Sequence, residues 1–93
     1  MDSAARRAWR GETELQLSPR ALTVLEFLMR HPGAVISKHE LIENVWDVGF
    51  DGDPNIVEVY ISRLRKAIDT PFDRRSVQTV RGGGYRLDAE DAE

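Results

Sequence analysis

The spacing of apolar and polar residues changes twice along the chain, and it predicts three helices between two short hairpins. From residue 8 to residue 17 the two kinds of residue alternate one by one around Gly11, as in a β-hairpin. Three later stretches carry an apolar stripe at helical spacing, and they cover about residues 19–30, 38–46 and 54–69. Residues 77–87 alternate again, around three consecutive glycines. The pattern predicts an α+β domain in the order hairpin, three helices, hairpin.

Signals at the helix starts support these ranges. Ser18 followed by Pro19 is an N-cap with proline at the first helical position. Ser37 and Glu40 have the spacing of a capping box. Asp53–Pro54 repeats the first signal, so the third helix is predicted to begin at residue 54. The predicted connections are an extended link and a glycine-containing loop, at residues 34–36 and 47–52.

Length and composition favour one globular domain. The chain has 93 residues, of which 41% are hydrophobic and 31% charged, and it contains no cysteine. No apolar run approaches the roughly 18 residues that cross a bilayer, and no secretory signal is visible, so we expect a cytoplasmic protein without membrane contact. Trp9 and Trp46 are predicted core residues. The predicted divisions are a remnant or linker, a folded domain and a disordered acidic tail, at residues 1–7, 8–87 and 88–93.

The net charge of −3 is unevenly distributed along the chain. Residues 55–87 hold seven Lys or Arg against three Asp or Glu, whereas residues 88–93 hold four acids and no base. Such a division is expected if one face meets phosphate groups. An imbalance of solvated surface charges without function remains an open alternative.

The third predicted helix has an unusual solvent face. A helical wheel gathers four apolar residues into a buried stripe, Val57, Ile61, Leu64 and Ile68. The opposite side has no acid on its centre line and carries Asn55, Val59, Ser62, Arg63 and Lys66. Tyr60 lies on one shoulder, and Glu58 and Arg65 on the other. Arginine can recognise guanine and valine a thymine methyl group, so this face suits a DNA groove. An ordinary exposed helix face with one valine is the alternative.

The second hairpin gives an independent indication. Arg81 precedes Gly82, Gly83 and Gly84, so a long cation projects from a tip that can approach another surface closely. Such an arginine fits a narrow minor groove, although the glycines also suit a simple flexible turn. A glycine-rich nucleotide-binding loop is excluded, because that motif requires a helix after the glycines and here a strand follows.

No enzyme chemistry is visible. The spacing of a catalytic triad is missing, and His31 at a helix end and His39 inside the capping box are interpreted as structural or surface residues. We therefore expect no catalysis, no metal and no cofactor.

Three motifs together resemble a known family. Leu17–Pro19, Val57–Lys66 and Val77–Leu87 occur in the order and spacing of the OmpR/PhoB-type effector domain of bacterial two-component response regulators. The resemblance covers residues 8–87 and implies a winged helix-turn-helix, with helix 54–69 in the major groove of DNA and wing 77–87 in the minor groove. The family normally has four N-terminal strands, so the chain looks like an excised C-terminal domain.

The resemblance also assigns roles to residues. Residues expected near bases are Asn55, Ile56, Val59 and Arg63. Residues expected near phosphates are Tyr60, Ser62 and Lys66, with Arg65 at the groove edge. Thr79 and Arg81 are the expected wing contacts. In the family the loop at residues 47–53 touches RNA polymerase, which implicates Val48, Phe50 and Asp51. Phe50 could equally cap the core.

Family members bind tandem half-sites as head-to-tail dimers after a sensor kinase phosphorylates the upstream receiver domain. The isolated domain is expected to be a monomer. A winged helix used only for protein contacts is the main rival, and the acid-free basic centre line of the third helix argues against it.

We predict a shallow salt dependence of DNA binding. Tyr60 and Ser62 stand where close relatives often have histidine and arginine, so fewer phosphates are neutralised. The slope of log K against log salt is expected to be no steeper than about −6 for one domain, at about −0.9 for each phosphate contact. Titrations at several salt concentrations test this, and a steeper slope contradicts it.

Overall fold

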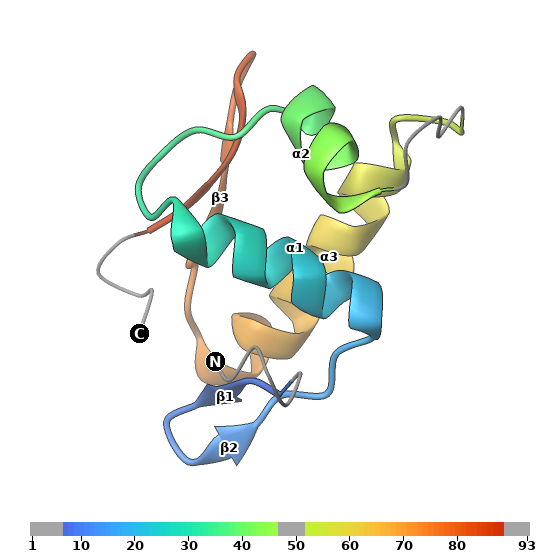
Figure 1. Cartoon of the computed structure of the whole chain (residues 1–93). Coiled ribbons are helices and arrows are strands. Elements are labelled where there is room, and N and C mark those ends of the chain that lie inside the picture. The colour runs from blue at the N-terminus through green and yellow to red at the C-terminus, as the bar shows by residue number, and fades with distance from the viewer. Residues whose placement is uncertain (1–6, 47–51, 89–93) are drawn as a thin grey trace.

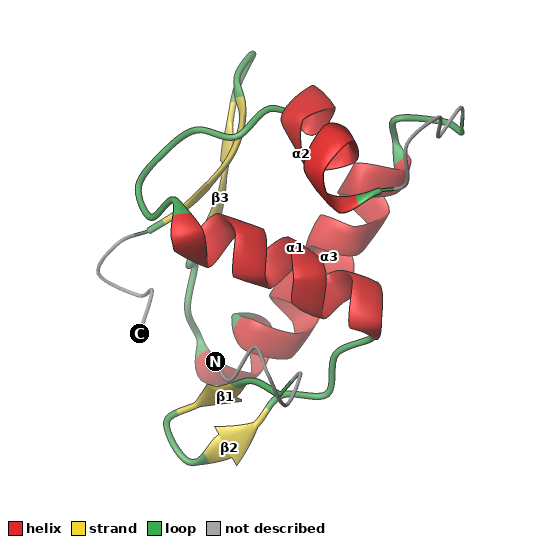
Figure 2. Ribbon diagram, viewed as in Figure 1, coloured by secondary structure: helices red, strands yellow, loops and turns green. Residues whose placement is uncertain are grey.

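The computed structural model describes residues 7–46 and 52–88, and these contain three α-helices between two small antiparallel sheets (Figures 1 and 2). In chain order the elements are β1 (Trp9–Arg10), β2 (Thr13–Glu14), α1 (Pro19–Arg30), α2 (Lys38–Val45), α3 (Ile56–Ile68), the 3₁₀ helix η1 (Thr70–Phe72), β3 (Val77–Val80) and β4 (Gly84–Leu87). The predicted α+β class and element order are confirmed. Most of the predicted linker and acidic tail lie outside the described residues.

Helix α1 has the predicted bounds and lies at the centre of the fold. The Ala21 amide donates to Ser18 Oγ at 3.2 Å, and Pro19 occupies the first turn. Its buried face consists of Ala21, Leu22, Val24, Leu25 and Leu28. This face contacts α2, α3 and β4, and Figure 1 shows α1 crossing α3. The helices therefore share one core.

Helix α2 begins at the predicted capping box but ends one residue early. The Glu40 amide donates to Ser37 Oγ at 3.0 Å, and the Ser37 amide donates to Glu40 Oε1 at 3.4 Å. The predicted range 38–46 is wrong at its end because Trp46 is extended, with ψ of 162°. Its indole packs against Tyr60 and is 9% exposed, which confirms its predicted place in the core.

Helix α3, predicted at residues 54–69, spans Ile56–Ile68. Asp53 Oδ1 accepts a hydrogen bond from the Asn55 amide at 2.9 Å, and the Asp53 carbonyl accepts one from the Ile56 amide at 3.0 Å. These contacts form a tight turn before the helix. Pro54 therefore leads into α3 and does not occupy its first position, which is why the predicted start is wrong.

Strands β1 and β2 pair across a turn in which Gly11 has a φ of 61°. Side chains alternate across the hairpin, so Ala8 is buried and Arg10 half-buried while Trp9 points outward and is 37% exposed. The Arg7 guanidinium lies 5.1 Å from the centroid of the Trp9 ring. The prediction that Trp9 belongs to the core is wrong, because the alternation gives the inner face to its neighbours.

The wing, β3 and β4, is bonded to the segment before α2. The Tyr85 amide donates to the Ile36 carbonyl at 2.8 Å, and the Ile36 amide donates to the Tyr85 carbonyl at 2.7 Å. Gly84 has a φ of 130°, and a Cβ on it would lie 2.1 Å from Ile36 O. The last glycine of the triplet is thus required for close packing.

The core lies where the three helices meet the inner face of the wing. Its large, fully buried apolar side chains are Val24, Leu28, Leu41, Val57, Ile61, Leu64 and Leu87. The predicted apolar stripe of α3 is buried as a whole. The opposite face of α3 is therefore left outside the core.

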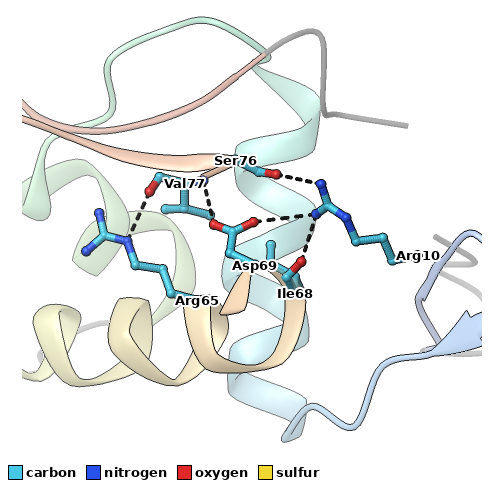
Figure 3. Close-up of polar contacts among 6 residues, drawn as sticks. All are labelled: Arg10, Arg65, Ile68, Asp69, Ser76 and Val77. Carbon is cyan, nitrogen blue, oxygen red and sulfur yellow. Dashed lines mark hydrogen bonds and ion pairs between the residues drawn. The ribbon is translucent and has the colours of Figure 1, made fainter. Parts of the chain in front are cut away.

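The carboxylate of Asp69, 4% exposed, joins three parts of the fold (Figure 3). Its Oδ2 accepts the Val77 amide of β3 at 3.1 Å, and its Oδ1 lies 3.5 Å from Arg10 Nη1 of β1. Arg10 also donates to the Ile68 carbonyl and to Ser76 Oγ, both at 2.9 Å. This partly buried ion pair and the other two hydrogen bonds of Arg10 therefore tie the N-terminal hairpin to the end of α3 and the start of the wing.

We predict that Asp69→Ala lowers the free energy of unfolding by about 3 kcal/mol, because it leaves the buried Val77 amide without its acceptor and removes the carboxylate that forms the ion pair with Arg10. Urea denaturation measures this. Glu12→Ala removes an exposed carboxylate from the β1–β2 turn and is expected to change stability by less than about 0.5 kcal/mol. Equal losses in the two variants would contradict the role given to Asp69.

Candidate nucleic-acid interface

The face of α3 opposite the core is exposed and carries most of the predicted contact residues. Val59 is 41% exposed, unusual for a large apolar side chain in this fold. The other exposed members are Asn55, Ser62, Arg63 and Lys66, and the half-buried ones are Ile56, Tyr60 and Arg65. The side chain of Asn55 makes no capping hydrogen bond to α3, so its amide is not used by the helix. The predicted exposed side of the helix is confirmed.

This face has a positive charge that the fold does not neutralise. Arg63, Lys66 and Arg81 make no ion pair with any residue that the structure describes. Glu58, the acid on the shoulder of α3, accepts a hydrogen bond from Lys38 of α2. This bond raises the pKa of Lys38 above its ordinary value, because it favours the charged form of the lysine. Lys38 and Glu58 therefore neutralise each other, and Glu58 does not offset the charges of the cations on α3 and the wing.

Tyr60 belongs to a row in which two neighbouring aromatic rings lie between two arginines. The Arg63 guanidinium lies 5.1 Å from the centroid of the Tyr60 ring. The Tyr60 ring packs edge to face with the Trp46 ring, and their centroids are 5.6 Å apart. On the far side, the Arg20 guanidinium lies 5.2 Å from the centroid of the Trp46 ring. Arg20 also donates to the Val45 carbonyl at the end of α2. Each contact is favourable, so the row orients Arg63 relative to α1 and α2.

Arg65 turns toward the wing. Its Nε donates to the Val77 carbonyl at 3.0 Å, and its Nη2 donates to Thr79 Oγ1 at 2.6 Å. The guanidinium also lies 5.8 Å from the centroid of the Tyr85 ring. Arg65 and Thr79, expected separately at the groove edge and on the wing, are thus brought together as one polar link between α3 and β3.

Arg81 lies at the exposed tip of the wing. The Gly83 amide donates to the Val80 carbonyl at 2.9 Å and closes a turn, in which Gly82 has a φ of 77°. An open groove separates this tip from the N-terminus of α2 and the first turn of α3, and its lining includes Lys38, Glu58 and Arg81. The tip and the N-terminal half of α3 therefore border a common groove.

Three predicted contact residues cannot be compared with the structure, and one important contact in the structure was not predicted. Val48, Phe50 and Asp51 lie outside the described residues, so their polymerase contact stays a prediction. Conversely, the sequence analysis did not identify the pairing of Arg10 with Asp69, which are 59 positions apart. No sequence period connects such distant residues.

Residues 7–46 and 52–88 contain neither a membrane-spanning helix nor a cluster of metal-ligating side chains. No helix there is long and apolar enough to span a bilayer. No three His, Asp or Glu side chains there gather closely enough to hold a metal ion.

Comparisons with known proteins agree with this geometry. Residues 12–87 match the family described as "Transcriptional regulatory protein, C terminal". The chain is 46% identical over 87 residues to the transcriptional regulatory protein TcrA of Mycobacterium tuberculosis, an alignment that covers 94% of this chain and 34% of TcrA. Curated relatives are longer proteins, of which the chain spans between 34% and 41%.

Two solved structures share the fold. The DNA-binding domain of Escherichia coli CadC has a TM-score of 0.79 and 32% identity, covering 90% of this chain and 79% of that one. The DNA-binding domain of Klebsiella pneumoniae RstA, solved in complex with the RstA box, has a TM-score of 0.81 and 31% identity. The match covers 95% of this chain and 88% of the RstA domain. The predicted winged-helix fold of response-regulator DNA-binding domains is thereby confirmed.

We predict that Arg65→Met lowers the free energy of unfolding by about 2 kcal/mol, because it keeps the apolar stem but removes the hydrogen bonds to Val77 and Thr79. Chemical denaturation measures the loss. The neighbouring Lys66→Met removes the same charge from an exposed side chain and is expected to cost less than about 0.5 kcal/mol. If the two variants are equally stable, the Arg65 link does not hold the wing.

Proposed function

The chain belongs to the family of C-terminal domains of transcriptional regulatory proteins, and we propose that it binds double-stranded DNA in a sequence-specific manner and so regulates transcription. The observation that carries the proposal is the outer face of α3. There, cations that pair with no carboxylate of residues 7–46 and 52–88 surround an exposed valine and polar side chains, beside a wing with an exposed arginine. The DNA complex of the structurally similar RstA domain supports it.

In the proposed complex α3 lies in the major groove, which is about 12 Å wide and admits one helix. Arg63 and Val59 are the leading base contacts, because a guanidinium recognises guanine and a valine meets a thymine methyl group. Asn55 and Ile56 complete the base-facing set, although Ile56 is half-buried against the core. Tyr60, Ser62 and Lys66 contact phosphates.

The wing enters the adjacent minor groove with Arg81 at its tip. A guanidinium is attracted by the negative potential of a narrow minor groove. Thr79 and Arg65 act together in this proposal, because their hydrogen bond fixes the distance between the wing and α3. Their contribution is to set the geometry of the groove edge.

We further propose partners for the whole protein. The length of the curated relatives is consistent with a receiver domain upstream that a sensor kinase phosphorylates. Phosphorylation then favours head-to-tail dimers of an otherwise monomeric domain on tandem half-sites. Residues Val48, Phe50 and Asp51 form the contact with RNA polymerase.

We predict that Arg63→Ala and Arg81→Ala each weaken DNA binding by about tenfold or more, since one good base or groove contact contributes about 1–3 kcal/mol. Sites selected by the unsubstituted domain from random DNA provide the probe, and mobility-shift titration measures affinity. Arg63→Ala is also expected to relax the base preference at one position.

Arg30→Ala is the matched control, because Arg30 is an exposed arginine at the end of α1 that pairs with Glu26. Its binding is expected to equal that of the unsubstituted domain. Unchanged binding in both Arg63→Ala and Arg81→Ala would overturn the proposed DNA interface and favour a module for protein contacts.

A further inference from the structure

A second basic surface lies between the C-terminal half of α3 and strand β3. An open groove there is lined by Arg65, Thr70, Arg74, Arg75, Gln78 and Thr79, together with Asp69 and Val77 at its base. Arg74 and Arg75 belong to the loop that joins η1 to β3, and both are exposed. Neither arginine has a role in the interface described above.

The groove keeps a positive charge despite the carboxylate at its base. Both oxygens of Asp69 are engaged, one by the Val77 amide and one by Arg10, which lies outside the groove lining (Figure 3). Arg65 is held by a carbonyl and a hydroxyl, and neither cancels its charge. Arg75 makes no hydrogen bond or ion pair with any described residue. An anion entering the groove therefore meets uncompensated guanidinium groups.

The loop that carries these arginines is anchored at both ends. The Arg74 amide donates to the Asp69 carbonyl at 3.0 Å, and Asp73 before it takes up a left-handed conformation with φ of 53°. Ser76, after the arginines, is fully buried and accepts a hydrogen bond from Arg10. The backbone at Arg75 is thus fixed between anchored neighbours, so binding needs to order mainly the Arg75 side chain and not the loop.

The position of the groove indicates which anion it takes. It shares Arg65 and Thr79 with the proposed interface, and it runs between the helix assigned to the major groove and the hairpin assigned to the minor groove. The sugar-phosphate strand that separates the two grooves of a duplex must pass between these elements. We propose that this groove binds a backbone phosphate of that strand, with Arg75 as the principal ligand. The proposal rests on the proposed function.

Salt titration with a random-sequence duplex tests this proposal. Arg75→Ala is expected to make the slope of log K against log salt shallower by about 0.9, the value for one lost phosphate contact. Arg75→Gln, which keeps a polar side chain of similar length, is expected to give the same shift. Arg75→Lys retains the charge and is expected to keep the slope. Arg30→Ala, the exposed arginine on α1, serves as the control.

Selection from random DNA gives a second readout. Phosphate contacts carry no direct sequence information, so Arg75→Ala is expected to select the same sites as the unsubstituted domain, unlike Arg63→Ala. If the unsubstituted domain binds DNA but both Arg75→Ala and Arg75→Gln leave the salt slope unchanged, the phosphate site alone is overturned. If the unsubstituted domain does not bind DNA at all, the proposed function is overturned as well.

Discussion

The arrangement of this fold depends on the buried carboxylate of Asp69. Its side chain accepts a hydrogen bond from the Val77 amide of the wing and forms an ion pair with Arg10 of the N-terminal hairpin. Its carbonyl accepts the amides of Phe72 and Arg74, both at 3.0 Å, and so shapes the loop after α3. A carboxylate withdrawn from water is stable only with such partners. The side chain and backbone of one residue thus set the positions of the hairpin, the loop and the wing relative to α3.

Arginine has two roles in this domain, and they explain why the total charge is a poor guide to its surface. The arginines that bond to main-chain carbonyls and hold elements together are Arg10, Arg20 and Arg65. Those that are exposed and have no ion-pair partner among the described residues are Arg63, Arg75 and Arg81. Composition counts both kinds alike. The net charge of −3 therefore conceals a basic surface on α3, the wing and the loop between them.

Features set by neighbours in the sequence were predictable, and those set by packing were not. The caps at Ser18 and Ser37 form within one helical turn, so they were found correctly. The same kind of signal failed at Asp53, where the side chain bonds to the Asn55 amide in a turn before the helix. Trp9 was misassigned because a short hairpin has two faces, and the sequence does not say which one meets the helices.

The candidate site shows the same division. The helical wheel identified the outer face of α3, because the apolar stripe fixes which side faces the core. The hydrogen bond between Arg65 and Thr79 escaped prediction, since it depends on how closely a strand approaches a helix. The placement of Arg75 beside that link depends likewise on the turn after α3.

The pairing of Ile36 with Tyr85 has a mechanical consequence. Arg65 bonds to one side of the hairpin and the segment before α2 bonds to the other, so both contacts restrain movement of the wing relative to the helices. The distance between α3 and the wing is then nearly constant. A duplex that binds both elements must have grooves at that spacing or deform to reach it, and the free-energy cost of deformation depends on base-pair stacking. Stiffness within the protein would thus select among base pairs that no side chain touches.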